Sequence, residues 1–344
     1  MKKGLKKVVL FLFFIISVLS FSEIRFKDDV GREIVLKKPL TKVVVASRYN
    51  NELIRAIGSI KNVIAVDTNT AQDRIYWSEF DPNNVIGKGQ NAINYEKIIE
   101  LAPEALITPR NSSYEKDIEQ LSKAGIEVIV VTGWDNANMP AQIERLGKMF
   151  ANEEGAKKLI DFYNKNLNEI TKRVAKIKNK KTIYWEYGNP FTTAIPGTSN
   201  DGWVSMMRTA GGLSIFDDPN IKGKTIDPEK ILINDPDLII KTTSGSALKN
   251  TGIYTAPSEE EYDEISKEMV SRSGWEDLKA VKNKNFYITT GFCAGGLGKL
   301  IGVAYTAKWL YPEEMKDIDP DKIFAEWMAM QKVETPKGHV YKLK

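Results

Sequence analysis

The sequence predicts two α/β lobes, each built on a parallel β-sheet, joined by one long α-helix. Three observations predict this architecture. Short β-branched apolar runs alternate with helical patterns, this alternation restarts near residue 181, and one motif occurs once in each half of the chain. At 344 residues, the chain is also long enough to favour two domains over one.

The first 22 residues have the features of a secretory signal peptide. A lysine-rich start precedes an apolar run from Val8 to Leu19, and Ser20-Phe21-Ser22 supplies a small-x-small cleavage site. The run is about 12 to 14 residues long, short of the roughly 20 that a membrane-spanning helix needs. Because no cysteine lies near the cleavage point, we expect an exported, periplasmic protein without a lipid anchor.

The N-terminal lobe is predicted at residues 23–152. Nearly continuous apolar runs, typical of parallel strands buried on both faces, lie at residues 42–47, 62–67, 104–108 and 127–133. Between them, NELIRAIG, YEKIIELA and YEKDIEQLSKAG have helical periodicity. An alternation of strands and helices predicts a parallel sheet with helices packed on it.

The linker helix is predicted at residues 153–179 and the C-terminal lobe at residues 180–344. In the linker, apolar residues recur at spacings of three and four without an intervening proline, which predicts a long amphipathic helix. Beyond it, KTIYWEYG, DLIIKTT and NFYITTG are typical of strands. Because a helical linker is stiff, the two lobes should move only modestly relative to each other.

The repeated motif is NYEKIIELAPEALIT at residues 94–108 and DPEKILINDPDLIIKT at residues 227–242. In each copy Glu-Lys-Ile begins a short helix, proline ends it, and an acidic residue leads into a strand. The shared offsets favour duplication of a half-molecule over chance recurrence. Glu96 and Glu229 therefore occupy equivalent places on the two lobes, although the helix dipole alone favours a carboxylate there.

The order of these motifs resembles that of a known family. The signal peptide, DDVGREIVLKKPLTKVVV, the two EKI-P units, the long helix between them and SGWEDLKAVKNKNFYIT follow one another as in the class III substrate-binding proteins of ABC importers for iron-siderophore, haem and cobalamin. The resemblance covers residues 24–328. It implies two Rossmann-like lobes bridged by a helix, with a ligand cleft between the lobes. It also implies a monomer that does no chemistry on its ligand.

The resemblance also implies a partner, an ABC permease dimer in the inner membrane. In the family, the glutamates at this motif position dock into arginine pockets on the two permease subunits, which assigns that role to Glu96 and Glu229. Paired charges at matched spacing set orientation and encounter rate more than raw affinity.

The candidate ligand-binding residues lie just after the predicted strands, because open parallel sheets bind ligands at the carboxyl ends of their strands. Arg48 and Arg110 are the main candidates, since a guanidinium presents a planar fork to carboxylate or chelating oxygens; the alternative for each is a surface ion pair. The further candidates are Tyr49, Asn50, Asn111 and Trp134 in the first lobe, and Trp185, Glu186, Tyr187, Ser244 and Phe292 in the second.

Several classes of function are disfavoured. The charge of +4 is spread without a basic block, so a nucleic-acid partner is not indicated. His339 is the only histidine, which excludes a three-histidine metal site, and no nucleophile elbow or P-loop is present, so we expect neither an enzyme nor a resident cofactor. Haem ligation by Cys293 is disfavoured, because a lone buried cysteine is usually inert.

The sequence therefore predicts a periplasmic receptor that captures a metal chelate, foremost a siderophore-type ferric complex, and delivers it to a permease. A corrinoid, haem or bare ferric iron stays open as cargo, because aromatic rings with a few polar groups suit several large or flat ligands. A cell-surface adhesin is the alternative from another class, and it would have no small-molecule cleft.

Overall fold

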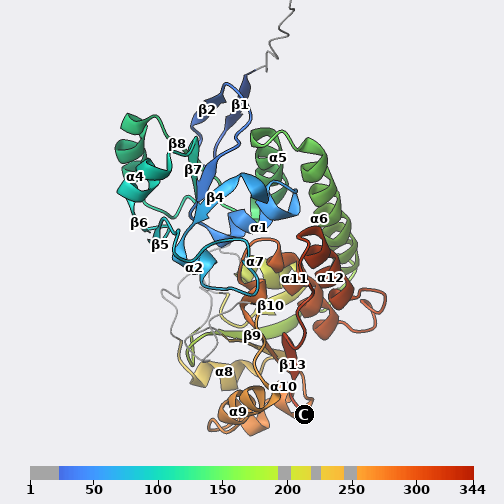
Figure 1. Ribbon diagram of the computed structural model, residues 1–344. Coiled ribbons are helices and arrows are strands. Elements are labelled where there is room, and N and C mark those ends of the chain that lie inside the picture. Colours follow the sequence, from blue (N-terminus) through green and yellow to red (C-terminus); the bar gives the residue numbers. More distant parts are fainter. Residues whose placement is uncertain (1–22, 193–202, 218–225, 244–253) are drawn as a thin grey trace, which may run out of the picture.

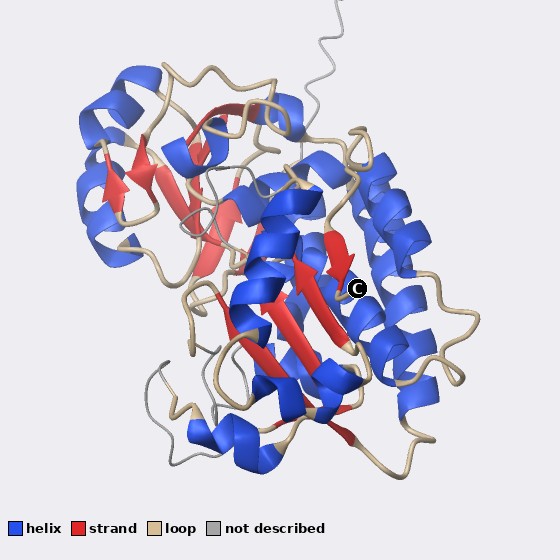
Figure 2. Ribbon diagram, turned by 90° about the horizontal axis from the view of Figure 1, so that it is seen from below, coloured by secondary structure: helices blue, strands red, loops and turns tan. Residues whose placement is uncertain are grey.

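The computed structural model describes residues 23–192, 203–217, 226–243 and 254–344 of the chain. In Figure 1 the N-terminal lobe, blue to green, lies above the C-terminal lobe, yellow to red, and helix α6 runs along one side of both. Figure 2 shows the strands of the two lobes as separate groups, each flanked by helices. The predicted fold class, two α/β lobes with parallel sheets, is confirmed.

The main sheet of the N-terminal lobe has four parallel strands in the order β4-β3-β7-β8. Nearly all of their residues are buried, as the continuous apolar runs predict, because helices cover both faces. The strands are β3 (Val43–Val45), β4 (Val63–Val66), β7 (Ala105–Thr108) and β8 (Glu127–Val130), and the α-helices are α1 (Arg48–Ala56), α2 (Thr68–Ala71), α3 (Tyr95–Leu101), α4 (Tyr114–Leu121) and α5 (Met139–Met149).

Two small antiparallel pairs complete this lobe. One joins β1 (Ile24–Lys27) to β2 (Glu33–Leu36), and the other joins β5 (Gly87–Gly89) to β6 (Ala92–Ile93).

The C-terminal lobe has five strands in the order β10-β9-β11-β12-β13. The first four are parallel, whereas β13, formed by the end of the chain, pairs antiparallel with β12, an addition that the sequence pattern did not predict. The strands are β9 (Lys181–Tyr187), β10 (Gly212–Ser214), β11 (Leu238–Thr242), β12 (Phe286–Thr289) and β13 (Val340–Lys342), and the α-helices are α7 (Trp203–Thr209), α8 (Glu229–Asn234), α9 (Glu259–Val270), α10 (Lys279–Lys282), α11 (Gly298–Leu310) and α12 (Pro320–Met330).

Helix α6 (Glu153–Val174) joins the two lobes. It begins where the Asn152 side chain accepts a hydrogen bond from the Gly155 amide, and it ends five residues before the expected 179. Beyond Val174 the chain makes tighter bonds, from the Lys176 amide to the Arg173 carbonyl and from the Ile177 amide to the Val174 carbonyl. The buried face of α6 belongs to a hydrophobic cluster that includes core residues of both lobes.

The two copies of the repeated motif have the same structure. Helices α3 and α8 each end at a residue in the left-handed conformation, Ala102 and Asp235, directly before the proline. The acidic residue after the proline then holds the start of the neighbouring strand. Glu104 accepts the Thr41 amide at 2.6 Å in the first lobe, and Asp237 accepts the Thr182 amide at 2.7 Å in the second. The matching role of this carboxylate supports duplication.

Candidate functional site

The lobes meet at Tyr49, which follows β3 at the start of α1. The ring of Tyr49 packs on the backbone of Gly295 and Gly296 from the C-terminal lobe, so closely that a Cβ added to Gly295 would lie 2.4 Å from the ring carbon Cζ. Tyr187, at the end of β9, approaches from the same lobe: burial raises the pKa of its hydroxyl, and Tyr49 and Arg48 act on it electrostatically. Tyr49 and Tyr187 thus come together from opposite lobes, as the cleft prediction requires.

A polar pocket of about 240 Å³ opens beside Arg48. Its carboxylate, hydroxyl and amide groups come from the N-terminal lobe and suit a small, strongly polar part of a ligand better than an apolar one. The lining residues are Ala46, Ser47, Arg48, Tyr49, Asp67, Asn69, Gln72 and Gln90.

Arg48 carries the positive charge of this pocket. Its guanidinium donates to the Tyr49 hydroxyl at 2.9 Å and lies 4.9 Å from the centre of that ring. Burial alone would lower the pKa of Arg48, but its interactions with Tyr49 and Glu52 outweigh burial and raise the pKa, so the group stays charged. Among the residues that the structure describes, no carboxylate oxygen lies within 4.0 Å of this guanidinium. Arg48 is therefore suited to hold an anion.

Arg110 is placed differently. It forms an ion pair with Asp135 and lies over the Trp134 ring, 4.6 Å from its centre, while the Trp134 indole donates to the Asn111 side chain at 2.9 Å. The structure thus brings three predicted residues together at the ends of β7 and β8. The charge of Arg110 is already balanced inside the protein, and a contact between this group and the ligand stays a prediction.

Asn50 is fully buried and ties α1 to the loop after β8. Its side chain donates to the Val131 carbonyl and accepts from the Gly133 amide, each at 2.8 Å. In this position Asn50 shapes the cleft by fixing the loop that carries Trp134. Direct contact with a ligand stays a prediction for Asn50 as well.

Three predicted residues of the C-terminal lobe lie in its interior. Strand β9 continues to Tyr187, so Trp185 and Glu186 lie within the strand, where Trp185 donates to Thr242 at 2.9 Å. Phe292 is buried and stacks on Phe324, with ring centres 4.9 Å apart. A further candidate, Ser244, lies outside the described residues.

Glu186 is the centre of a buried ionic cluster. Its carboxylate accepts from Lys241 and from Arg272, each at 2.6 Å, and from the Tyr184 hydroxyl at 2.8 Å. Burial would raise the pKa of Glu186, but the bonds from Arg272 and Lys241 outweigh it and lower the pKa. The carboxylate therefore serves as an internal counter-ion in this structure.

Glu52 and Tyr254 belong to the lobe junction, and sequence reasoning missed both. The Tyr254 hydroxyl, from the C-terminal lobe, donates to Glu52 of α1 at 3.0 Å. Nearby, the Tyr76 hydroxyl donates to Gln331 at 2.5 Å, again between lobes. A signal for Glu52 was present in the sequence, because it follows Arg48 by four positions on one helix, the spacing at which opposite charges interact.

Cys293 and His339 are both buried. Burial raises the pKa of the Cys293 thiol to about 11 and lowers that of His339 to about 4, so the thiol is protonated and the imidazole neutral near pH 7. His339 adjoins a pocket of about 410 Å³ between α11, α12 and the C-terminal segment. Within the described residues, no group of three or more histidine, cysteine or acidic side chains is placed to hold a metal ion.

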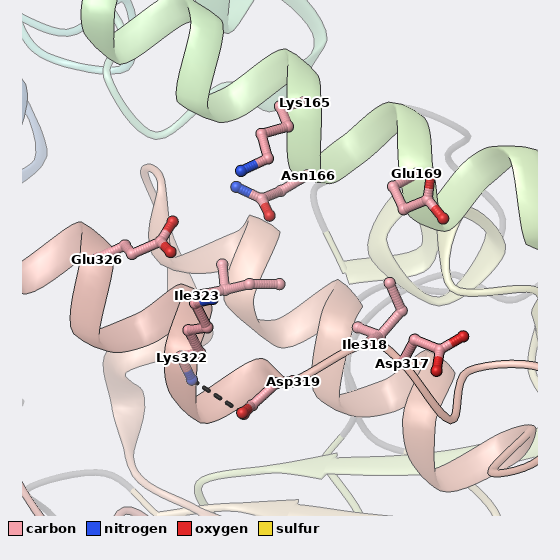
Figure 3. A pocket seen from close by; sticks show the side chains of 9 residues that line it. All are labelled: Lys165, Asn166, Glu169, Asp317, Ile318, Asp319, Lys322, Ile323 and Glu326. Atoms are coloured by element: carbon pink, nitrogen blue, oxygen red, sulfur yellow. Dashed lines mark hydrogen bonds between the residues drawn. The ribbon is translucent and has the colours of Figure 1, made fainter.

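A third hollow, of about 310 Å³, lies between α6 and the segment 317–326, outside the cleft. Figure 3 shows Lys165, Asn166 and Glu169 projecting from α6 toward this segment. Both acidic and basic side chains line the hollow, and the Asp319 side chain caps α12 by accepting from the Lys322 amide. The hollow thus has a mixed charge and no contribution from the predicted ligand-binding residues.

Glu96 and Glu229 are both exposed at the starts of their helices, α3 and α8. One turn further along, each helix also exposes an apolar residue, Ile99 at 45% and Leu232 at 37%. The two lobes thus present matching pairs of one carboxylate and one aliphatic side chain.

Comparison with known proteins identifies the class. Residues 43–291 match the family described as periplasmic binding protein, and because this match covers most of the chain, the protein belongs to that family. The family binds solutes, and its members serve ABC transporters as extracytoplasmic receptors. The importer class predicted from the order of motifs is thereby confirmed, and the adhesin alternative loses its support.

Individual proteins of this class resemble the chain over much of its length. The chain is 23% identical over 297 residues, 84% of its length and 86% of the relative's, to the uncharacterized ABC transporter substrate-binding lipoprotein YvrC of Bacillus subtilis. It is 22% identical to the vitamin B12-binding protein of Pectobacterium atrosepticum, over 63% of this chain and 76% of that one. The TroA-like periplasmic binding protein FepB from Veillonella parvula superposes with a TM-score of 0.76 at 25% identity, over 93% of this chain and all of that one.

None of the helices in the described part of the chain combines the length and the apolar character needed to cross a bilayer. One relative is a lipoprotein, and the expectation that this protein carries no lipid anchor stays a prediction. The expected signal peptide, residues 1–22, lies outside the described residues.

Proposed function

We propose that this protein captures an anionic metal chelate, foremost a ferric complex of the siderophore type, and delivers it to an ABC permease. The observation that carries the proposal is Arg48, a half-buried guanidinium beside a polar pocket at the lobe junction, with no carboxylate within 4.0 Å among the described residues. A charge partly removed from water without a counter-ion is costly, and an anionic ligand supplies that counter-ion.

The ligand's charge distinguishes the candidate cargoes. A ferric complex with carboxylate or catecholate arms presents negatively charged oxygens to Arg48, as the propionates of haem also do, and charge-assisted bonds of this kind are strong. A corrinoid is the second candidate, supported by the similarity to a vitamin B12-binding protein, but it offers Arg48 less negative charge. Tyr49 and Tyr187 would pack against the body of either ligand.

The test of this proposal is a titration followed by tryptophan fluorescence. Trp134 stacks under Arg110, and Trp185 lies in β9 two residues before Tyr187, so ligand entry should change the emission. The purified protein would be titrated with ferric catecholate and ferric hydroxamate complexes, cobalamin and haem. Saturable binding of an anionic ferric chelate, weakened by Arg48→Met, would support the proposal. Saturation by cobalamin alone would overturn the ferric assignment and leave the importer class intact.

Docking to the permease is a separate part of the proposal. Glu96 and Glu229 are assigned to two basic pockets on the permease dimer, because both are exposed and stand at equivalent places of the duplicated element. The Glu96→Ala, Glu229→Ala double variant should bind ligand normally and fail in uptake by cells. A matched control is Glu100→Ala, which removes another exposed carboxylate from the same helix α3. Normal uptake by the double variant, or loss of ligand binding, would contradict docking.

A further inference from the structure

A carboxyl group lies buried at the junction of the lobes without a role in the proposed function so far. Glu52 is on α1, one helical turn after Arg48, and is 2% exposed. One carboxylate oxygen accepts from the Tyr254 hydroxyl of the C-terminal lobe at 3.0 Å. The other faces Gly296 of the same lobe, since a Cβ there would lie 3.4 Å from it. Glu52 therefore connects α1, the helix that carries Arg48, with the opposite lobe.

The charges that face Glu52 come from its own helix. Arg48 and Arg55 both act on it electrostatically, and Tyr254 and Tyr76 are the titratable groups packed beside it from other segments. Arg55 is already engaged, because it forms an ion pair with Glu79 at 2.7 Å. Arg48 is therefore the cation whose field at Glu52 changes when an anion enters the pocket.

We propose that Glu52 takes up a proton when an anionic ligand neutralises Arg48, so that the site accepts an anion and a proton together. The proposal rests on the proposed function only in that the ligand is an anion. The proton comes from solvent and adds to a carboxylate oxygen of Glu52, and no bond of the ligand is made or broken. The residue thereby sets the net charge that the closed site accepts, which makes it a determinant of specificity.

The electrostatics of the free protein are consistent with this role. Burial raises the pKa of Glu52 to about 7, while the bond from Tyr254 and the charges of Arg48 and Arg55 hold it from rising further. An anion at Arg48 cancels one of these lowering effects, so the pKa rises again on binding. Below pH 7, Glu52 of the free protein is already mostly protonated, so ligand binding takes up little further proton. Above pH 7, Glu52 is mostly ionised, so ligand binding must be accompanied by proton uptake. Affinity should therefore fall as pH rises above about 7, by at most about tenfold per pH unit for one proton.

A second carboxyl group near Arg48 is the rival site of protonation. Asp67 lines the pocket, accepts from the Thr70 hydroxyl at 2.6 Å, and also has a pKa raised by burial. Asp67 differs from Glu52 because, among the described residues, its hydrogen-bond partners all belong to the N-terminal lobe. The tests must therefore separate Glu52 from Asp67.

The first test needs no ligand. The carboxyl carbons of glutamate and aspartate would be followed by NMR through a pH titration of the wild type and of Arg48→Met, which imitates neutralisation by an anion. The Glu52 midpoint should lie near 7 in the wild type and about one pH unit or more higher in the variant. A wild-type midpoint below about 5, or the same midpoint in both proteins, would overturn the proposal.

Asp117 serves as the matched control within the same spectra. It is also buried, accepts from a tyrosine hydroxyl, Tyr95, at 2.8 Å, and has a pKa raised by burial, but it lies on α4 away from the lobe junction. Its midpoint should be the same in both proteins, which also shows that Arg48→Met is folded. If Arg48→Met does not fold, Arg48→Gln serves in its place.

The second test measures proton uptake directly. Ferric tris-catecholate would be bound at pH 8 in buffers of different ionisation enthalpy, followed by calorimetry. Uptake should be about 0.4 proton or more per bound complex in the wild type and in Asp117→Asn, since a pKa that rises from about 7 to about 8 or higher gives at least this change at pH 8, and it should fall close to zero in Glu52→Gln. Uptake that persists in Glu52→Gln and disappears in Asp67→Asn would assign the proton to Asp67 and sink the proposal. Failure of this probe to bind would count against the ferric cargo, while the NMR titration still decides on Glu52.

Discussion

The two lobes use the polar groups at their strand ends in opposite ways. In the N-terminal lobe, Arg48 and Asp67 line an open polar pocket. In the C-terminal lobe, the corresponding groups bind one another: Glu186 accepts from Lys241 and Arg272 within the protein, and Trp185 donates to Thr242. Polar groups at or near the strand ends thus have different surroundings in the two lobes.

This difference suggests that the two lobes contribute differently to the cleft. The N-terminal lobe supplies charge and hydrogen bonds, whereas the C-terminal lobe supplies a surface of fixed shape, with Gly295 and Gly296 against Tyr49 and the half-buried Tyr187 beside it. An ionic cluster that is satisfied internally holds its strand ends rigidly. Variants in the two lobes should therefore separate stability from ligand binding.

The largest effect is expected on the stability of the C-terminal lobe. Replacing Glu186 by Gln removes the charge that balances Lys241 and Arg272, which are both buried. Breaking a buried ion pair from one side typically costs about 3 to 5 kcal/mol of unfolding free energy. Urea denaturation followed by circular dichroism measures this loss.

A control for this variant lies on the same arginine. Glu268 also pairs with Arg272, at 3.0 Å, but its side chain is 54% exposed, so Glu268→Gln should cost less than about 1 kcal/mol. Equal losses for Glu186→Gln and Glu268→Gln would mean that burial of the cluster does not stabilise the lobe. A Glu186→Gln protein with normal stability and no ligand binding would instead place Glu186 in the ligand site.

The next largest effect is expected on ligand binding by the N-terminal lobe. Arg48→Met should weaken the binding of an anionic chelate by about 1.5 to 3 kcal/mol, the range for a charge-assisted bond. Arg110→Met should cost less, because Asp135 already balances Arg110 in the free protein. The double variant is expected to lose about 2 to 4 kcal/mol, with non-additivity for residues of one site.

Titration of the three variants with the same chelate, monitored by fluorescence, measures this difference. The stability of each variant, from urea denaturation, is the control for folding. An equal loss for both single variants would show that Arg110 exchanges Asp135 for the ligand. Unchanged affinity in the double variant would remove both arginines from the site.

Much of the fold follows from the sequence, because its signals are local. The apolar runs of β3, β7 and β8 are continuous, and a strand buried on both faces needs no further information to be recognised. The antiparallel strand β13 was not predicted, because VYK is short and its pairing partner β12 lies about 50 residues earlier in the chain. The linker helix was predicted too long, because Ile177 continues the apolar spacing while the backbone has already turned.

The site could be predicted only in part. The rule that ligands gather at strand ends selected Arg48, Tyr49 and Tyr187, which lie together at the lobe junction, and their contact with a ligand stays a prediction. The same rule selected Glu186, which lies within β9. Whether a polar group near a strand end stays available to a ligand depends on partners far away in the chain. For Glu186 these partners are Lys241 and Arg272. Pairing across such distances leaves no periodic signal in one sequence.

The smallest effect is expected on the shape of the molecule. The lobes are already tied together, because Tyr254 donates to Glu52, Tyr76 donates to Gln331, and α6 shares one hydrophobic cluster with both lobes. Saturation with ligand should therefore change the radius of gyration by less than about 1 Å in small-angle X-ray scattering.

The Tyr76→Phe, Tyr254→Phe variant sharpens this last expectation. It removes both tyrosine hydroxyls from the junction and leaves the aromatic packing, with ring centres 4.0 Å apart, in place. If these bonds hold the lobes at a fixed distance, the variant should show a larger change on binding than the wild type. A wild-type compaction of several ångströms (~3 Å or more) would show that α6 bends, and that a stiff linker does not govern the cleft.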